Sequence, residues 1–137
     1  MVLRIDFLSV QGEQIAMPIL ELSIVGDLPV DRREGLAQRV ADVAGTLFGV
    51  PHGTTWVRVS EVPADSYAEN GGAAPDPLPV FVSILRAQPP EGLALEQEAA
   101  RFAAALSLEL GRPIERIHLI YELAGRGRVA FGGKLKT

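Results

Sequence analysis

The sequence predicts an α+β fold of two layers, a duplicated β-α-β arrangement in which a four-stranded sheet carries two helices on one face. Two observations predict this fold. Segments typical of strands and helices follow one another in the same order twice along the 137 residues. The glycines and prolines that end these segments also recur, about sixty-one positions apart, and chance rarely keeps several such residues in register.

The first unit has the pattern of a strand, a helix and a second strand. Residues 18–25 are β-branched and apolar, which favours a strand, and residues 55–62 have the same character. Asp31 and Glu34 are spaced as a capping box, which predicts the start of a helix. The helix is then predicted by an apolar stripe at helical spacing, made of Leu36, Val40, Val43, Ala44 and Leu47.

The second unit repeats this order. Residues 79–85 and 117–123 predict strands, and Gly111 with Pro113 ends the intervening helix as Gly49 with Pro51 ends the first. The stripe of this helix is Leu95, Ala99, Phe102, Leu106 and Leu110. A Gly/Pro-rich linker joins the units. We therefore interpret residues 18–137 as one domain of two repeats, 18–72 and 79–133, after an N-terminal extension of residues 1–17.

The handedness of β-α-β crossovers makes the two strands of each unit parallel. Two units joined edge to edge place both helices on one face of the sheet and leave the other face uncovered. Oligomerisation, for example into a symmetric ring, is the natural way to bury that face.

Composition excludes several classes of function. The chain has no cysteine, which removes disulfides, thiolate nucleophiles and Cys-based zinc sites and suits a cytoplasmic protein. The two histidines, His52 and His118, lie too far apart in the pattern for a metal site. A net charge of −4 without a basic block disfavours nucleic acid as a partner. No apolar run approaches the ~20 residues that span a bilayer, and no signal peptide is evident.

The first unit resembles 4-oxalocrotonate tautomerase and its relatives. The shared features are Met17 and Pro18 before the strand, Gly49 and Pro51 after the helix, and Arg58 between two valines in the next strand. Residues 18–135 as a whole resemble the fused members of the tautomerase superfamily, such as malonate semialdehyde decarboxylase and the 3-chloroacrylic acid dehalogenases. The resemblance implies a tautomerase/MIF-like fold, a homotrimer and no cofactor.

The resemblance also implies a reaction. In this family the initiator methionine is removed and the exposed proline amine acts as general acid or base, which makes Pro18 the expected catalytic residue. The implied activity is that of a tautomerase or isomerase acting on a small anionic 2-keto or enol carboxylate. The decarboxylase's water-activating aspartate falls on Thr54, so decarboxylation and dehalogenation are disfavoured alternatives.

The resemblance further implies five substrate-binding residues. Arg86 ends the third strand where fused relatives place an arginine for the substrate carboxylate; the alternative is a solvated strand end. Either Arg58 has a related role, or Trp56 is an apolar wall or packs between subunits. Phe131 matches an aromatic residue that walls the family's site. Asn70 has the equivalent place in the first repeat, where a turn is the alternative explanation.

Pro18 presents one conflict, because its nitrogen is an amide when a residue precedes it. One interpretation is that translation begins at Met17. The other is that the extension is real, since Leu3, Ile5 and Phe7 alternate with polar residues as in a half-buried strand. In that case the chain is a non-catalytic trimeric protein of the tautomerase fold, with its site blocked by the extension. The sequence leaves both open.

Overall fold

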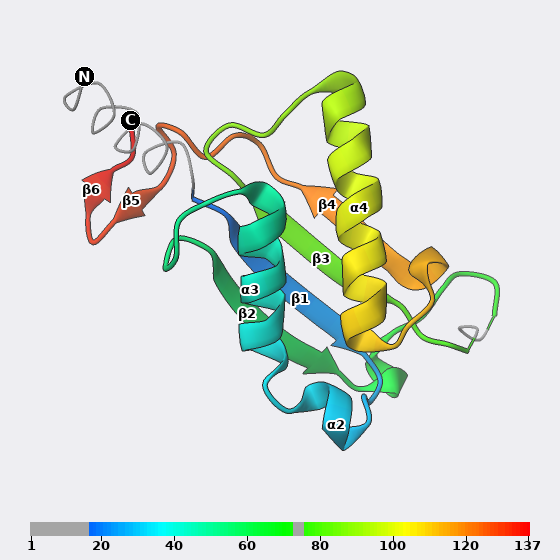
Figure 1. Ribbon diagram of the computed structural model, residues 1–137. Coiled ribbons are helices and arrows are strands. Elements are labelled where there is room, and N and C mark those ends of the chain that lie inside the picture. The colour runs from blue at the N-terminus through cyan, green and yellow to red at the C-terminus, as the bar shows by residue number, and fades with distance from the viewer. Residues whose placement is uncertain (1–16, 73–75) are drawn as a thin grey trace.

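The computed structural model describes residues 17–72 and 76–137. They form a four-stranded sheet, two long helices on one of its faces, and a small C-terminal hairpin (Figure 1). This is the α+β architecture that the duplicated pattern predicts. The strand expected within the extension lies outside the described residues.

The sheet has the strand order β2-β1-β3-β4, with bounds β1 Ile19–Val25, β2 Trp56–Val62, β3 Val80–Leu85 and β4 Ile117–Tyr121. Each unit contributes a parallel pair, β1 with β2 and β3 with β4, as predicted. The two units meet along an antiparallel contact between β1 and β3, which begins at the pair Ile19 and Leu85. The next residue on each strand is therefore Pro18 on one side and Arg86 on the other.

Both long helices, α3 (Leu36–Phe48) and α4 (Gly92–Leu110), cover the same face of the sheet (Figure 1). Residues with even numbers in β1 and β3 point toward these helices, because side chains alternate along a strand. The core they enclose includes Leu20, Leu22, Ile24, Val82, Ile84, Leu36, Val40, Ala44, Phe102, Leu106 and Leu110. The two apolar stripes seen in the sequence thus supply the helical half of the core.

The predicted capping box is wrong. Asp31 lies inside a separate short helix, α2 (Val30–Arg33), whose N-cap is Pro29 and has no side-chain cap. Gly35 then adopts a left-handed conformation (φ 67°) and caps α3. The chain therefore turns between Glu34 and Leu36, which separates the acidic pair from the helix that it was expected to start.

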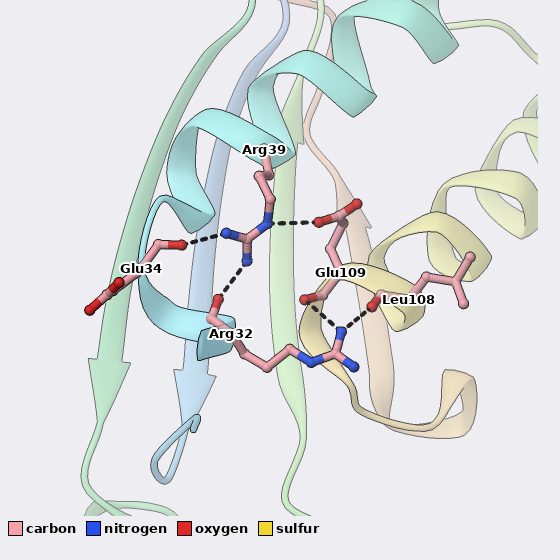
Figure 2. Close-up of polar contacts among 5 residues, drawn as sticks. All are labelled: Arg32, Glu34, Arg39, Leu108 and Glu109. Carbon is pink, nitrogen blue, oxygen red and sulfur yellow. Dashed lines mark hydrogen bonds and ion pairs between the residues drawn. The ribbon is translucent and has the colours of Figure 1, made fainter. Parts of the chain in front are cut away.

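Two arginines at this turn hold it against the C-terminal end of α4 (Figure 2). The Arg32 Nη1 donates to the carbonyl of Leu108 at 2.6 Å, where a helix end leaves carbonyls without helical partners. Arg39 donates to Glu109 Oε1 at 2.9 Å and to the Arg32 carbonyl at 2.6 Å. These arginines therefore join the two repeats through a structural contact.

The other face of the sheet is covered by no helix in the described part of the chain (Figure 1). Trp56 and Ile120, which point to this face, are 51% and 52% exposed. The remaining elements are two 3-10 turns, η1 (Ala64–Ser66) and η2 (Ile114–Arg116), and the hairpin of β5 (Ala130–Phe131) and β6 (Lys134–Leu135). Within the described residues, no helix is long and apolar enough to cross a membrane.

Candidate functional site

Pro18 lies at the start of β1, at the end of the sheet where β2 also begins. Its side chain is less than 2% exposed. The amide of Trp56 donates to the Pro18 carbonyl at 3.0 Å, so the beginning of β2 holds this residue in place. The Pro18 nitrogen forms a peptide bond with Met17 and in this form has no basic lone pair.

Met17 is buried against the loop that follows β4. Its side chain is 6% exposed, and its backbone has a φ of 102°, unusual for a residue with a side chain. A Cβ at Gly125 would lie 3.2 Å from the Met17 Cε and 3.3 Å from Leu85. The Gly125 amide also donates to the Arg86 carbonyl at 2.7 Å. Because Gly125 has no side chain, the loop after β4 can pack directly against Met17.

Arg86 lies beside Pro18, but its side chain has an internal partner. It points under the helices and forms an ion pair with Glu98 of α4; the side chains are 17% and 9% exposed. The guanidinium also lies over the ring of Phe48, 4.6 Å from the ring centroid, a favourable cation–π geometry. The alternative considered from the sequence, an arginine exposed to solvent at the end of its strand, is therefore excluded.

Tyr121, at the end of β4, completes this network. Its hydroxyl donates to Glu98 Oε2 at 2.7 Å, so both carboxylate oxygens have partners inside the protein. Burial, together with the hydrogen bond to Glu98, raises the pKa of Tyr121 above its ordinary value. The phenol therefore stays a protonated donor at neutral pH. We call these three residues the Arg86–Glu98–Tyr121 network.

Trp56 and Phe131 meet at the same end of the sheet. Their rings are in edge-to-face contact, with centroids 5.4 Å apart and an interplanar angle of 88°. The Trp56 indole donates to the Gly53 carbonyl at 3.0 Å, which fixes the ring. The C-terminal hairpin is thereby attached to the beginning of β2. Pro18, Arg86, Trp56 and Phe131 are all brought to one region, from four separate segments of the chain.

Arg58 and Asn70 lie elsewhere. Arg58 points to the uncovered face, where it forms an ion pair with Glu21; the arginine side chain is 75% exposed. Asn70 lies between the two bridged residues Glu69 and Gly72. The neighbouring Tyr67 ring contacts Phe81, near the start of β3. At about 3.4 Å per residue, that point lies roughly 17 Å from Arg86 along the strand.

A shallow hollow opens on the uncovered face next to the first residue of β1. Ser83 donates to Glu122 inside it, and the ion pair of Glu21 with Arg58 borders it. Its walls combine apolar and charged side chains from β1, β3 and the loop that follows β4: Ile19, Glu21, Ser83, Leu85, Glu122, Leu123, Arg128 and Val129. Ile19, the residue after Pro18, lines this hollow.

The sequence interpretation missed Glu98 and Tyr121. One signal was present, because Glu98 follows Leu95 by three residues and precedes Phe102 by four, which places a carboxylate on the apolar stripe of α4. Tyr121 carried no comparable signal. Within the described residues, no three His, Asp or Glu side chains are grouped so as to hold a metal ion.

Comparisons with known proteins bear on the fold. No protein-family model and no curated protein matches the sequence. A fused 4-OT solved as an asymmetric trimer is similar in structure, with a TM-score of 0.71 and 18% identity over 86% of this chain and 95% of that one. Pt0534, solved after inactivation by 2-oxo-3-pentynoate, gives a TM-score of 0.70 and 13% identity over 86% and 94%.

The macrophage migration inhibitory factor of Trichinella spiralis is similar as well, with a TM-score of 0.66 and 17% identity over 85% of this chain and 98% of that one. Identities this low establish the fold and leave activity to be argued from the site. The chain has the fold of the tautomerase superfamily and its MIF-like members, as the resemblance in sequence predicted.

Proposed function

We propose that this protein is a cofactor-independent tautomerase or isomerase of a small 2-keto or enol carboxylate. In the active form, Pro18 is the first residue and its secondary amine moves the proton. The observation that carries the proposal is the register of β1 and β3, which sets Pro18 next to Arg86 at the end of the sheet. A proton-transfer group and a carboxylate-binding cation would thus be neighbours.

Tautomerisation suits such an amine because it needs no net gain or loss of atoms or electrons. The neutral amine removes the hydroxyl proton of the enol while the carbonyl forms, and the ammonium returns a proton to the adjacent carbon. An ordinary α-amino group has a pKa of about 8, and burial lowers that value because it disfavours the charged form. An amine with a pKa near neutral is an effective acid–base catalyst.

The other predicted residues would shape the site. Arg86 would bind the substrate carboxylate, and Trp56 and Phe131 would form an aromatic wall at the same end of the sheet. Arg58 and Asn70, which lie away from Pro18 within one chain, would contribute from neighbouring subunits. That role requires an oligomer, and we propose a homotrimer. The exposed Trp56 and Ile120 on the uncovered face support it, and similar fused 4-OT structures are described as trimers.

The oligomer can be tested directly. Light scattering after size exclusion should give a mass near three times that of the 14.7 kDa chain. A monomeric mass would remove the contribution of Arg58 and Asn70 to a neighbour's site.

The catalytic proposal is tested with two forms of the protein, the full chain and a chain begun at Met17. Mass spectrometry must first confirm that the second form starts at Pro18. We expect it to ketonise phenylenolpyruvate or 2-hydroxymuconate, as followed by ultraviolet absorbance, and the full chain to be inactive. The matched control is Pro18→Ala in the short form. An inactive short form, or an undiminished rate in Pro18→Ala, would reject the proposal.

A covalent probe gives a second test. One structural neighbour was inactivated by 2-oxo-3-pentynoate, an alkynone to which an amine can add in conjugate fashion. We expect the short form to gain the mass of one probe molecule on the peptide that begins at Pro18. The full chain, with an acylated Pro18 nitrogen, should gain none there. Equal labelling of both forms would mean that the reactive group is not the amine.

The burial of Met17 and Pro18 favours a second candidate function. In this alternative the protein is non-catalytic and the chain before Pro18 blocks the site. It predicts that protein isolated from its native source retains Met17, and that the full chain binds no 2-keto acid. Native protein that begins at Pro18 would exclude it. Decarboxylation stays disfavoured, because the expected aspartate position holds Thr54, whose hydroxyl donates to the Pro51 carbonyl.

A further inference from the structure

Arg86, which the proposed function assigns to the substrate carboxylate, is already paired with a carboxylate of the protein. Arg86 Nη1 is paired with Glu98 Oε1, and both side chains are largely buried. Phe48 covers one face of the guanidinium. The second Glu98 oxygen accepts the Tyr121 hydroxyl at 2.7 Å, which also holds the carboxylate in place. The positive charge of Arg86 is therefore neutralised by Glu98, a residue of the same chain.

A buried ion pair of this kind is weak evidence for a contribution to the stability of the fold. Removing charges from water has a large desolvation cost, and apolar residues of similar size often serve as well at such positions. The position of Glu98 on α4 is otherwise apolar, since Phe102, Leu106 and Leu110 continue the same buried face. The network thus places an acid where packing alone would favour an apolar side chain.

The geometry also shows how Glu98 holds the arginine. It contacts Arg86 through a single nitrogen, and its other oxygen accepts the Tyr121 hydroxyl, which keeps the carboxylate in this position. A guanidinium binds a free carboxylate best through two parallel hydrogen bonds. An external carboxylate could therefore use a stronger binding mode than the internal one, once Glu98 no longer neutralises the charge.

We propose that Glu98 is the specificity-determining residue of this site, an internal carboxylate that competes with the ligand's carboxylate for Arg86. Tyr121 favours the internal partner by holding Glu98 against the arginine. A ligand must displace Glu98 or bind beside its negative charge, so simple monocarboxylates bind weakly to the wild-type protein. The reference to a substrate rests on the proposed function, but the competition itself is independent of catalysis.

The test measures carboxylate binding in the full chain. The variants are Glu98→Gln, which keeps the shape and removes the charge, and Arg86→Gln with Glu98→Gln, which also removes the cation. Thermal unfolding is followed in sodium acetate or sodium formate against sodium chloride at equal ionic strength. We expect the carboxylates to raise the melting temperature of Glu98→Gln by several degrees more than that of the wild type. The double variant should respond as the wild type does.

Affinity provides the quantitative readout. The apparent dissociation constant for acetate should be at least tenfold lower in Glu98→Gln than in the wild type. Tyr121→Phe, which leaves the ion pair in place, should give a smaller gain and serves if Glu98→Gln does not fold. Equal responses of Glu98→Gln and the wild type would overturn the proposal. A double variant that gains as much from acetate as Glu98→Gln does would overturn it as well. An unfolded Glu98→Gln with no gain in Tyr121→Phe would also overturn it.

The outcomes separate this inference from the proposed function. A short form without turnover, in which Glu98→Gln still gains carboxylate affinity, rejects catalysis by Pro18 and supports the competition. An active short form without that gain rejects the competition and leaves the role of Pro18 intact.

Discussion

The ring of Phe131 meets the ring of Trp56 edge-on, with 5.4 Å between their centroids. This contact joins the C-terminal hairpin to the first residue of β2. A two-stranded hairpin is marginally stable on its own in water. The position of the hairpin next to Pro18 therefore depends on this aromatic pair as well as on backbone hydrogen bonds such as that from Gly127 to Lys136.

Phe131→Ala should loosen the hairpin without unfolding the sheet. An edge-to-face pair contributes about 0.5–1.5 kcal/mol beyond its buried area, so amide hydrogen exchange in β5 and β6 should become roughly twofold to tenfold faster. Leu135→Ala is the matched control, because this residue of the same hairpin is exposed. Hairpin exchange at the wild-type rate in Phe131→Ala would show that the aromatic contact does not hold this segment.

Tyr121 should titrate at higher pH than an ordinary tyrosine. Burial and the hydrogen bond to Glu98 both disfavour the phenolate, which raises its pKa above 10.0. The folded state then binds this proton more tightly than the unfolded state. Its contribution to stability is complete below about pH 10 and is lost as the pH rises through the folded-state pKa.

Ultraviolet titration can isolate this group in a Tyr67→Phe background, since Tyr67 is the other tyrosine of the chain. The phenolate absorbance of Tyr121 should rise at a higher pH than that of an ordinary tyrosine. Tyr121→Phe should also make the free energy of unfolding fall less steeply with pH above 10. A midpoint at the ordinary value would contradict the buried hydrogen bond to Glu98.

Gly125→Ala should destabilise the protein because a methyl group would make tight contacts there. Its Cβ would lie 3.2 Å from Met17, 3.3 Å from Leu85 and 3.4 Å from the Arg86 carbonyl. Overpacking of this kind costs about 1–3 kcal/mol, and urea unfolding should show a lower midpoint. Gly72→Ala is the control, since nothing lies within 4 Å of a Cβ at that position. Equal midpoints for the two variants would mean that the loop after β4 moves aside easily.

Arg112→Met should lower the stability of the protein by removing hydrogen bonds at the end of the sheet opposite to Pro18. The guanidinium donates to the carbonyls of Val25 at 3.0 Å and Asp27 at 3.3 Å, and also to that of Leu78. Leaving such acceptors without partners costs about 1–3 kcal/mol each when they are buried, so we expect a loss of about 3 kcal/mol. Arg101→Met, on the exposed side of α4, should stay within about 0.5 kcal/mol of the wild type.

Much of the fold could be predicted because its signals are local. β-Branched and apolar runs identified the strands, helical spacing identified both long helices, and the repeated Gly and Pro residues identified the duplication. The capping box at Asp31 and Glu34 failed because spacing does not reveal the backbone conformation of Gly35. Arg32 shows the same limit, since its partner lies on α4 and only the packed helices bring the two together.

The candidate site was predictable in part. The family resemblance pointed to Pro18 and Arg86, but their neighbouring positions follow from the antiparallel contact of β1 with β3, which the structure shows. The contact of Trp56 with Phe131 and the distance of Asn70 from Pro18 depend on how segments far apart in sequence fold against one another.

Two similar β-α-β units, their parallel pairing and the position of a proline before the first strand were determined by the sequence alone. The spacing of apolar residues, and the Gly and Pro residues that end each element, indicate them directly. Only the tertiary structure decided that the Arg86 guanidinium is paired with Glu98, that Tyr121 holds this acid, and that Met17 and Pro18 are buried. A charged side chain selects its partner by distance and exposure, and these exist only after α4 has packed on the sheet.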